Sequence, residues 1–87
     1  MPAVAEITVD ATTGGTIAIA SSNTREEVLL RCRGGRVYIG FNETAVAATG
    51  IWLDSGDAIV IAQPLCQAAM YFVTAGATAY IGAQTVF

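Results

Sequence analysis

Few residues in this chain could do chemistry, and the spacing of the best candidates favours a turn over a catalytic site. The chain has no histidine and no lysine, so a serine, threonine or cysteine nucleophile would lack its usual base. Asp54 and Asp57 could form an acid/base pair, but Asp-Ser-Gly-Asp is also typical of a polar turn, because aspartate accepts hydrogen bonds from nearby backbone N–H groups. We therefore predict a turn and a protein that is not an enzyme, with a loosely bound cation as a minor alternative.

Metal and nucleotide sites are not predicted either. Cys32 and Cys66 lie far apart, and without histidine or a Cys-x-x-Cys pair they cannot form a Cys/His zinc site. The sequence lacks the glycine-rich patterns that bind phosphate, so no cofactor is expected. We expect both cysteines to be buried as small apolar residues in a chain made in a reducing cytosol, with a disulfide between them as the alternative.

The arginines indicate a binding role instead. Arg31, Arg33 and Arg36 lie close together around a Gly-Gly pair. Like charges held side by side destabilise a strand pair unless something neutralises them. Solvent or the nearby Glu26 and Glu27 could do so within the chain. Alternatively, the carboxylates of a partner protein do so, since arginine binds carboxylate through two parallel hydrogen bonds.

A second copy of the chain offers one such partner. The Asp54/Asp57 turn of one subunit could meet the arginines of the next subunit in a cyclic homo-oligomer. Tyrosine and tryptophan beside polar turns are typical of protein interfaces and of sugar sites, although a lone tryptophan in so small a domain is more often in the core. The predicted protein-interface residues are Arg31, Arg33, Arg36, Tyr38, Trp52, Asp54 and Asp57.

Short strand-like runs must position these residues. Runs rich in valine, isoleucine, alanine and threonine alternate with glycine-containing turns, and no segment has helical periodicity of useful length. This pattern predicts an all-β fold, either a small antiparallel β-sandwich or a jelly-roll-like barrel of about eight short strands. The expected strands are Val4–Val9, Thr16–Ala20, Glu26–Cys32, Arg36–Phe41, Gly50–Asp54, Asp57–Ala62, Ala69–Ala75 and Ala77–Ala83.

Glycine turns predict hairpins between neighbouring strands. Gly34-Gly35 suits a two-residue type I′ turn, and Ser55-Gly56 and Gly76 suit two further tight turns. The expected cross-strand pairs are Arg33–Arg36, Cys32–Val37, Leu30–Ile39 and Val28–Phe41 for the first turn, Asp54–Asp57 and Trp52–Ile59 for the second, and Tyr71–Tyr80 for the third. Because side chains alternate along a strand, one apolar face is expected to form the core. Its members are Val28, Leu30, Cys32, Val37, Ile39 and Phe41.

The triplet Tyr-Ile-Gly occurs twice, at residues 38–40 and 80–82, each time near the end of a strand-like run. It suits a strand that sends isoleucine into the core and tyrosine to the opposite face, with glycine permitting a bend or a close neighbour. The flanking segments do not align, so we do not infer an internal repeat.

Composition limits the architecture and the partners. The 87 residues suffice for one domain, residues 1–87, with residues 1–6 as a candidate extended arm. Charged residues make up only 13%, against roughly 25% in ordinary soluble domains, so we expect an assembly to cover part of the surface. The net charge of −3 argues against nucleic acid as a partner. No run reaches the roughly 18 apolar residues of a membrane helix, and no signal peptide is expected.

Three stretches together resemble a known class of proteins. Residues 36–41 (RVYIGF), 42–61 (NETAVAATGIWLDSGDAIVI) and 71–83 (YFVTAGATAYIGA) are similar to small virion proteins of tailed bacteriophages. In that class a strand ending in VYIGF is followed by a loop of small residues, a short apolar strand, a glycine turn and a closing pair of strands. The similarity covers the chain from about Val28 onward and rests on apolar spacing and turns, so it carries over no catalytic residues.

The resemblance implies a capsid decoration, or cement, protein, or else a head-fibre or tail-associated component. Such a protein is an all-β module, often a homotrimer, made in the cytoplasm of the bacterial host and fixed to the outside of the virion. Its expected partners are the major capsid protein or another virion protein, together with further copies of itself. The alternative is a tail- or fibre-associated module that binds a receptor or a glycan, which an exposed Trp52 beside Asp54 and Asp57 would favour.

Overall fold

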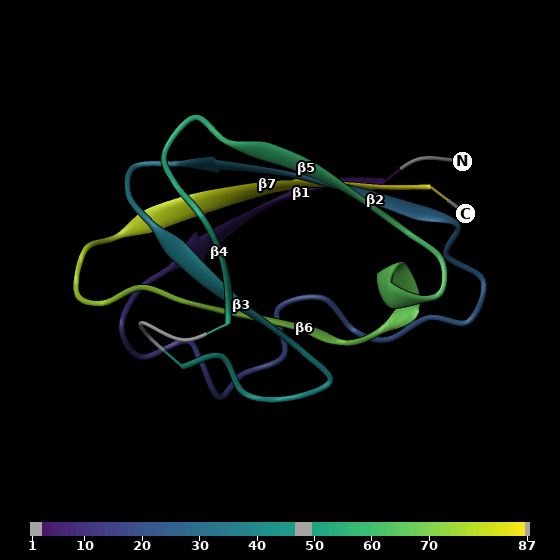
Figure 1. Ribbon diagram of the computed structural model, residues 1–87, viewed down its shortest axis with the longest axis horizontal. Coiled ribbons are helices and arrows are strands. Elements are labelled where there is room, and N and C mark those ends of the chain that lie inside the picture. The colour runs from purple at the N-terminus through teal and green to yellow at the C-terminus, as the bar shows by residue number, and fades with distance from the viewer. Residues whose placement is uncertain (1–2, 47–49, 87) are drawn as a thin grey trace.

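Two antiparallel sheets pack face to face in the computed structural model (Figure 1). It describes residues 3–46 and 50–86, and within these ranges one sheet has the strand order β1-β7-β2-β5 and the other β4-β3-β6. The elements are β1 (Ala3–Val9), β2 (Glu27–Arg33), β3 (Val37–Phe41), β4 (Ile51–Leu53), β5 (Ala58–Ala62), the 3₁₀ turn η1 (Leu65–Gln67), β6 (Met70–Val73) and β7 (Ala79–Val86). No helix within the described ranges has the length and apolar character to cross a membrane.

The strands are connected in the order of a jelly roll. Residues 16–20, predicted as a full strand, form only an isolated bridge between Ile19 and Met70, which extends the smaller sheet beyond β6. The Met70 N–H donates to the Ile19 carbonyl at 2.8 Å, and the Ala18 N–H donates to the Met70 carbonyl at 2.9 Å. With this segment in the eighth position, every connection except β3 to β4 crosses to the opposite sheet, which is the jelly-roll pattern. The predicted all-β fold class is confirmed.

The core lies between the facing sides of the two sheets. Of the six residues predicted to share one apolar face, five are buried in it and Phe41 packs against it half-buried. The buried members of this core are Val9, Val28, Leu30, Cys32, Val37, Ile39, Leu53, Ile61, Cys66, Met70, Phe72, Ala79, Ile81 and Ala83.

The predicted hairpin pairings are wrong, although the apolar faces are right. β2 pairs with β5 and β7, whereas β3 pairs with β4 and β6, so the two strands around Gly34-Gly35 lie in different sheets. The strands around Ser55-Gly56 and around Gly76 are separated in the same way. Arg33–Arg36, Trp52–Ile59 and Tyr71–Tyr80 are therefore not ladder pairs. The alternation of side chains along a strand determines which side chains share a face, whichever strand is the partner. That apolar face is buried here between two facing sheets, as it would also be in a hairpin that packs on a core.

The N-terminal segment is a strand rather than an arm. Residues 3–6, part of the arm predicted at 1–6, belong to β1, which pairs with β7 from Ala3 opposite Thr85 to Val9 opposite Ala79. Met1 and Pro2 lie outside the described residues. β1 is therefore an edge strand of the larger sheet.

The two Tyr-Ile-Gly triplets lie in β3 and β7, and their isoleucines are buried as predicted. Their glycines serve different purposes. A Cβ on Gly40 would lie 2.3 Å from the Glu43 carbonyl oxygen, so the loop after β3 lies directly against the strand. A Cβ on Gly82 would meet nothing nearer than the Arg31 carbonyl at 4.0 Å. Only the first glycine is required by a close neighbour.

Candidate interaction surface

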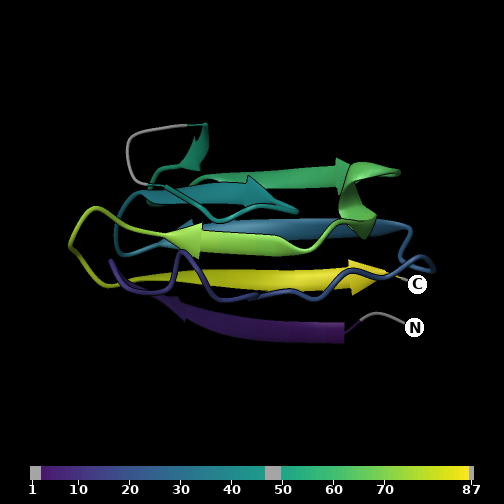
Figure 2. The same ribbon diagram turned by 90° about the horizontal axis from the view of Figure 1, so that it is seen from below.

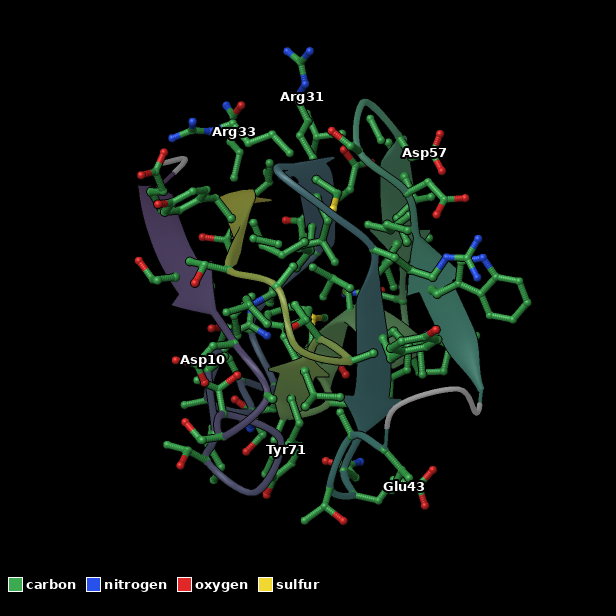
Figure 3. The ribbon with its side chains drawn as sticks, turned by 90° about the vertical axis from the view of Figure 1, so that its left-hand side faces the viewer. Asp10, Arg31, Arg33, Glu43, Asp57 and Tyr71 are labelled. Atoms are coloured by element: carbon green, nitrogen blue, oxygen red, sulfur yellow. The ribbon has the colours of Figure 1, made fainter. Side chains whose placement is uncertain are left out.

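Two turns meet at one end of the sandwich and bring the predicted arginines and aspartates to that end (Figure 3). The Gly34 N–H donates to Ser55 Oγ at 3.2 Å, which joins the β2–β3 turn to the β4–β5 turn. The Cys32 N–H donates to the Asp57 carbonyl at 2.9 Å and the Gly56 N–H to the Cys32 carbonyl at 2.8 Å. Hydrogen bonds from backbone N–H groups thus hold the two turns side by side.

Asp54 and Asp57 form the turn that the sequence predicts. The Asp57 N–H donates to the Asp54 carbonyl, and the Asp54 N–H donates to Asp57 Oδ2, both at 2.9 Å. Gly56 has φ +93°, a conformation that favours glycine. The Asp57 carboxylate therefore accepts a hydrogen bond from the backbone of its own turn.

Arg36 is neutralised within its own chain. Its Nε donates to Asp54 Oδ1 at 2.7 Å, and its guanidinium lies over the Trp52 ring, 5.2 Å from the centroid. The hydrogen bond that Arg36 donates to Asp54, followed by its hydrogen bond with Tyr38, raises the pKa of Arg36 above its usual value. Both Arg36 and Asp54 are exposed. The predicted contact between the arginine tip of one subunit and the aspartate tip of the next is therefore not needed to neutralise Arg36.

Arg33 also has an intramolecular partner, which differs from the one expected. Its Nη2 donates to Glu6 Oε2 at 2.8 Å, and its guanidinium lies 4.5 Å from the centroid of the Tyr80 ring. The Glu6 carboxylate raises the pKa of Arg33 above its usual value. The sequence pointed to Glu26 and Glu27, because it does not reveal that β7 lies between β1 and β2 and brings Glu6 within reach.

Arg31 is the predicted arginine that faces solvent. Figure 3 shows its side chain pointing away from the body of the sandwich, and its guanidinium has no ion pair or hydrogen bond with any residue in the described ranges. It lies on the outer face of the larger sheet, directly opposite Ala58 and Gly82. Arg31 is therefore free to bind a partner.

The two predicted aromatic contacts differ in exposure. Trp52 is 48% exposed at the edge strand β4, with its ring edge-on to Tyr38 at 6.3 Å between centroids. Tyr38 is only 8% exposed, because Ala45 of the following loop and Val73 of β6 pack against it. Tyr38 therefore presents little surface to a partner, and its role at an interface stays a prediction.

Sequence reasoning missed an apolar flank. β4 and β5 are the edge strands of the two sheets on the same side of the sandwich, and β1 lies on the opposite side (Figure 2). Ile51 and Trp52 of β4 and Val60 of β5 are each about half exposed there. The signal was the run AIVIA in β5, which has no charge although it is an edge strand, and which reads equally well as a buried strand.

Two features of the described residues bear on chemistry, the spacing of their possible metal ligands and one groove. That part contains no cluster of three or more histidine, cysteine or acidic side chains able to hold a metal. A groove of about 280 Å³ between β1 and residues 16–18 is lined by apolar residues and threonines, without a titratable side chain. Such a lining offers no acid or base.

Both cysteines are free and buried, as predicted. Burial raises the pKa of the Cys32 thiol above its usual value. Near Cys66 lies a buried residue that the sequence did not single out: Arg25 donates from Nη1 to the Cys66 carbonyl at 2.8 Å and from Nη2 to the Ala20 carbonyl at 2.7 Å. Arg25 thus ties the segment before β2 to η1 and is not part of the exposed arginine group.

Comparisons with known proteins bear on the fold. No family model matches the chain, and no curated protein matches it. A solved structure from Bacillus endospore appendages, described as a novel family of disulfide-linked pili, matches with a TM-score of 0.55 and 17% identity, covering 98% of this chain and 81% of that chain. At this identity the likeness shows a shared fold over nearly the whole chain.

Proposed function

We propose that the chain is a non-enzymatic structural subunit that binds as an oligomer to the outer head surface of a tailed bacteriophage and stabilises the capsid. The observation that carries the proposal is the exposed apolar flank of β4 and β5 beside the unpartnered Arg31. Exposed apolar surface on a small domain marks a site of protein contact. The resemblance of residues 28–87 to small virion proteins gives the proposal its phage setting.

The mechanism is added interface area between neighbouring capsid subunits. The flank lies on the broad side of the molecule, seen face-on in Figure 1, where the whole molecule extends over 33 by 23 Å. A specific interface of standard size needs roughly 800 Å² on each partner, so an interface of this size would occupy most of this side. Tryptophan and arginine carry much of the binding energy in such interfaces, so Trp52 and Arg31 are the expected anchors.

The test adds purified protein to capsids that lack a decoration protein. We expect saturable binding in co-sedimentation and a higher temperature of capsid rupture. Arg31→Glu should weaken binding about tenfold or more, because it reverses an anchor charge, whereas Asn23→Glu, an exposed change elsewhere, should not. Capsids that neither bind the protein nor gain stability would refute the proposal.

A tail or fibre module that binds a glycan is less favoured by the geometry. Arg36 lies over one face of the Trp52 ring and binds Asp54, so two of the groups that would hold a sugar are already in contact with Arg36. Binding to an array of bacterial glycans, with no binding to capsids, would support this alternative instead.

A filament subunit is the second candidate, favoured by the fold shared with the Bacillus endospore appendage structure. That family is described as disulfide-linked, whereas Cys32 and Cys66 of this chain are buried. A filament of this chain would therefore be held by non-covalent contacts. Electron microscopy of concentrated protein distinguishes the candidates, because long filaments formed by the chain alone would contradict the decoration role.

A further inference from the structure

We propose that β5 is a self-complementary edge through which two copies of the chain pair about a twofold axis, joining their larger sheets into one continuous sheet. The inference rests on the proposed structural role and assigns β5 and Arg31 to the contact between copies within the oligomer. Trp52, opposite Tyr38 on the outer face of the smaller sheet, is left for the capsid. A twofold pair gives a dimer, in place of the trimer that the resemblance to virion proteins implies.

The backbone of β5 is free on its outer side. Within the described ranges β5 pairs only with β2, at the end of the order β1-β7-β2-β5. The bond from the Cys32 N–H to the Asp57 carbonyl sets the phase of this ladder. Because inward and outward groups alternate along an antiparallel strand, the N–H and C=O groups of Ala58, Val60 and Ala62 point away from β2.

The side chains of these three residues do not block pairing. All three are exposed, and β5 contains no charge and no proline. Edge strands are usually protected by lysine, proline, a bulge or short length. β4 is protected by its length of three residues, and β1 carries Glu6, whereas β5 has five residues and none of these devices.

The sequence of β5 is symmetric about Val60. In an antiparallel pair centred there, Val60 lies opposite Val60 of the second copy and Ala58 lies opposite its Ala62, giving about six backbone hydrogen bonds. The flanking Asp57 lies opposite Gln63, so no like charges meet. Leu29 is opposite Val60 within the chain, so the four side chains nearest the twofold axis in the central row, Leu29 and Val60 of each copy, are all apolar.

On either side of this central row, the next row of side chains that share the outer face contains opposite charges. On β2, Arg31 is opposite Ala58 and Glu27 is opposite Ala62. Pairing of two copies therefore places Arg31, Ala58, Ala62 of the second copy and its Glu27 in one row on the same face. The arginine and the glutamate are three strand spacings apart, or about 14 Å between Cα atoms, and only alanines lie between them. Two long side chains can meet over these alanines, once on each side of the axis.

Pairing would also cover apolar surface that the single chain leaves open. Ile51 of β4 lies opposite the buried Ile39 of β3, so the Ile51 side chain is directed to the core side of the smaller sheet. It is nevertheless 51% exposed. β4, which begins at Ile51, is the edge strand on the same flank as β5 (Figure 2). A second copy against β5 shields this flank.

The test measures association in solution, without capsids. By sedimentation and light scattering, wild type should form a particle of twice the 9.0 kDa chain mass, and its Ala58, Val60 and Ala62 amides should exchange more slowly as concentration rises. Val60→Lys places two like charges at the axis and should raise the dimer Kd about tenfold or more. Ile17→Lys, an equally exposed change on the opposite flank, should leave it unchanged.

A charge exchange tests the predicted rows. Arg31→Glu should weaken pairing, because it faces Glu27 of the second copy, and adding Glu27→Arg should restore it. A monomer, a trimer, or a dimer that Ile17→Lys breaks and Val60→Lys does not would overturn the inference. If wild type binds capsids but does not dimerise, the pairing alone is wrong; if it dimerises but does not bind capsids, the decoration role alone is wrong.

Discussion

Single side chains at the turn end of the sandwich form exposed ion pairs within the chain. Arg36 binds Asp54 and covers Trp52, and Arg33 binds Glu6 and covers Tyr80. Exposed ion pairs of this kind contribute little to folding, because water screens both charges. Their effect is to hold flat aromatic and guanidinium surfaces in fixed orientations, which reduces the entropy lost when a partner binds.

Asp10 is the residue at which stability should depend on pH. The Thr12 hydroxyl and N–H donate to Asp10 Oδ1 at 2.6 and 2.7 Å, which lowers the pKa of Asp10 below its usual 3.8. A carboxyl whose pKa is lower in the folded state stabilises above its unfolded pKa, and this stability is lost as pH falls through the folded value.

The pH dependence is tested with Asp10→Asn. The variant should melt at a lower temperature than wild type at about pH 6, and the difference should shrink as pH falls below about 3.8. Thermal melts followed by circular dichroism across this range measure the effect. A difference that stays constant with pH would show that the carboxylate charge is not the cause.

Loops take the place of a third layer over one sheet. The outer face of β3 is covered by the loop that follows it, and the Ala45 N–H in this loop donates to the Gly14 carbonyl at 3.0 Å. A Cβ on Gly14 would lie 2.5 Å from the Ala45 carbonyl oxygen, so this loop contact also needs a glycine. The larger sheet has no such cover over Arg31 and Val60, which is why its outer face and edge are available for contact.

The two Tyr-Ile-Gly triplets provide a matched test of this loop packing. Gly40→Ala should lower the free energy of unfolding by about 1–3 kcal/mol, because the new methyl group collides with the Glu43 carbonyl. Gly82→Ala has room for the methyl group and should be neutral or slightly stabilising, within about 0.5–1 kcal/mol. Urea unfolding of both variants measures the difference. An equal change in the free energy of unfolding for both variants would mean that the loop after β3 does not pack closely against Gly40.

The whole molecule has one core that both sheets share. Almost every connection crosses from one sheet to the other. The strands of one sheet therefore cannot leave the core without pulling strands of the other sheet out of their ladders. Small domains built in this way usually unfold in a single cooperative step. Cys32 of β2 and Cys66 of η1 lie in this core, so their thiols report on its opening.

Thiol labelling tests this cooperativity. In the native protein neither cysteine should react with a thiol reagent at about neutral pH, because both are buried and burial raises the pKa of Cys32. Both should become reactive together at the urea concentration at which the circular dichroism changes. Labelling of one cysteine before the other would show that part of the sandwich opens separately.

Local properties of the sequence determined the strands, their apolar faces, the Asp54–Asp57 turn and the buried cysteines. Each of these depends on residues within a few positions of one another, through the two-residue alternation and the preferences of turns. Seven of the eight predicted segments contain a strand, and residues 16–20 form only a bridge because they reach the smaller sheet at one point.

Only the tertiary structure decided which strands pair and what each site residue meets. The hydrogen bonds of a sheet join backbone groups that every strand has, so the side chains of one strand do not identify the strand with which it pairs. Strand order brought Glu6 to Arg33, the loop after β3 buried Tyr38, and the position of β5 at an edge exposed Val60. These contacts join residues far apart in the chain, and the free energy of burying a whole face, rather than any local pattern, selects among the arrangements that would bury it.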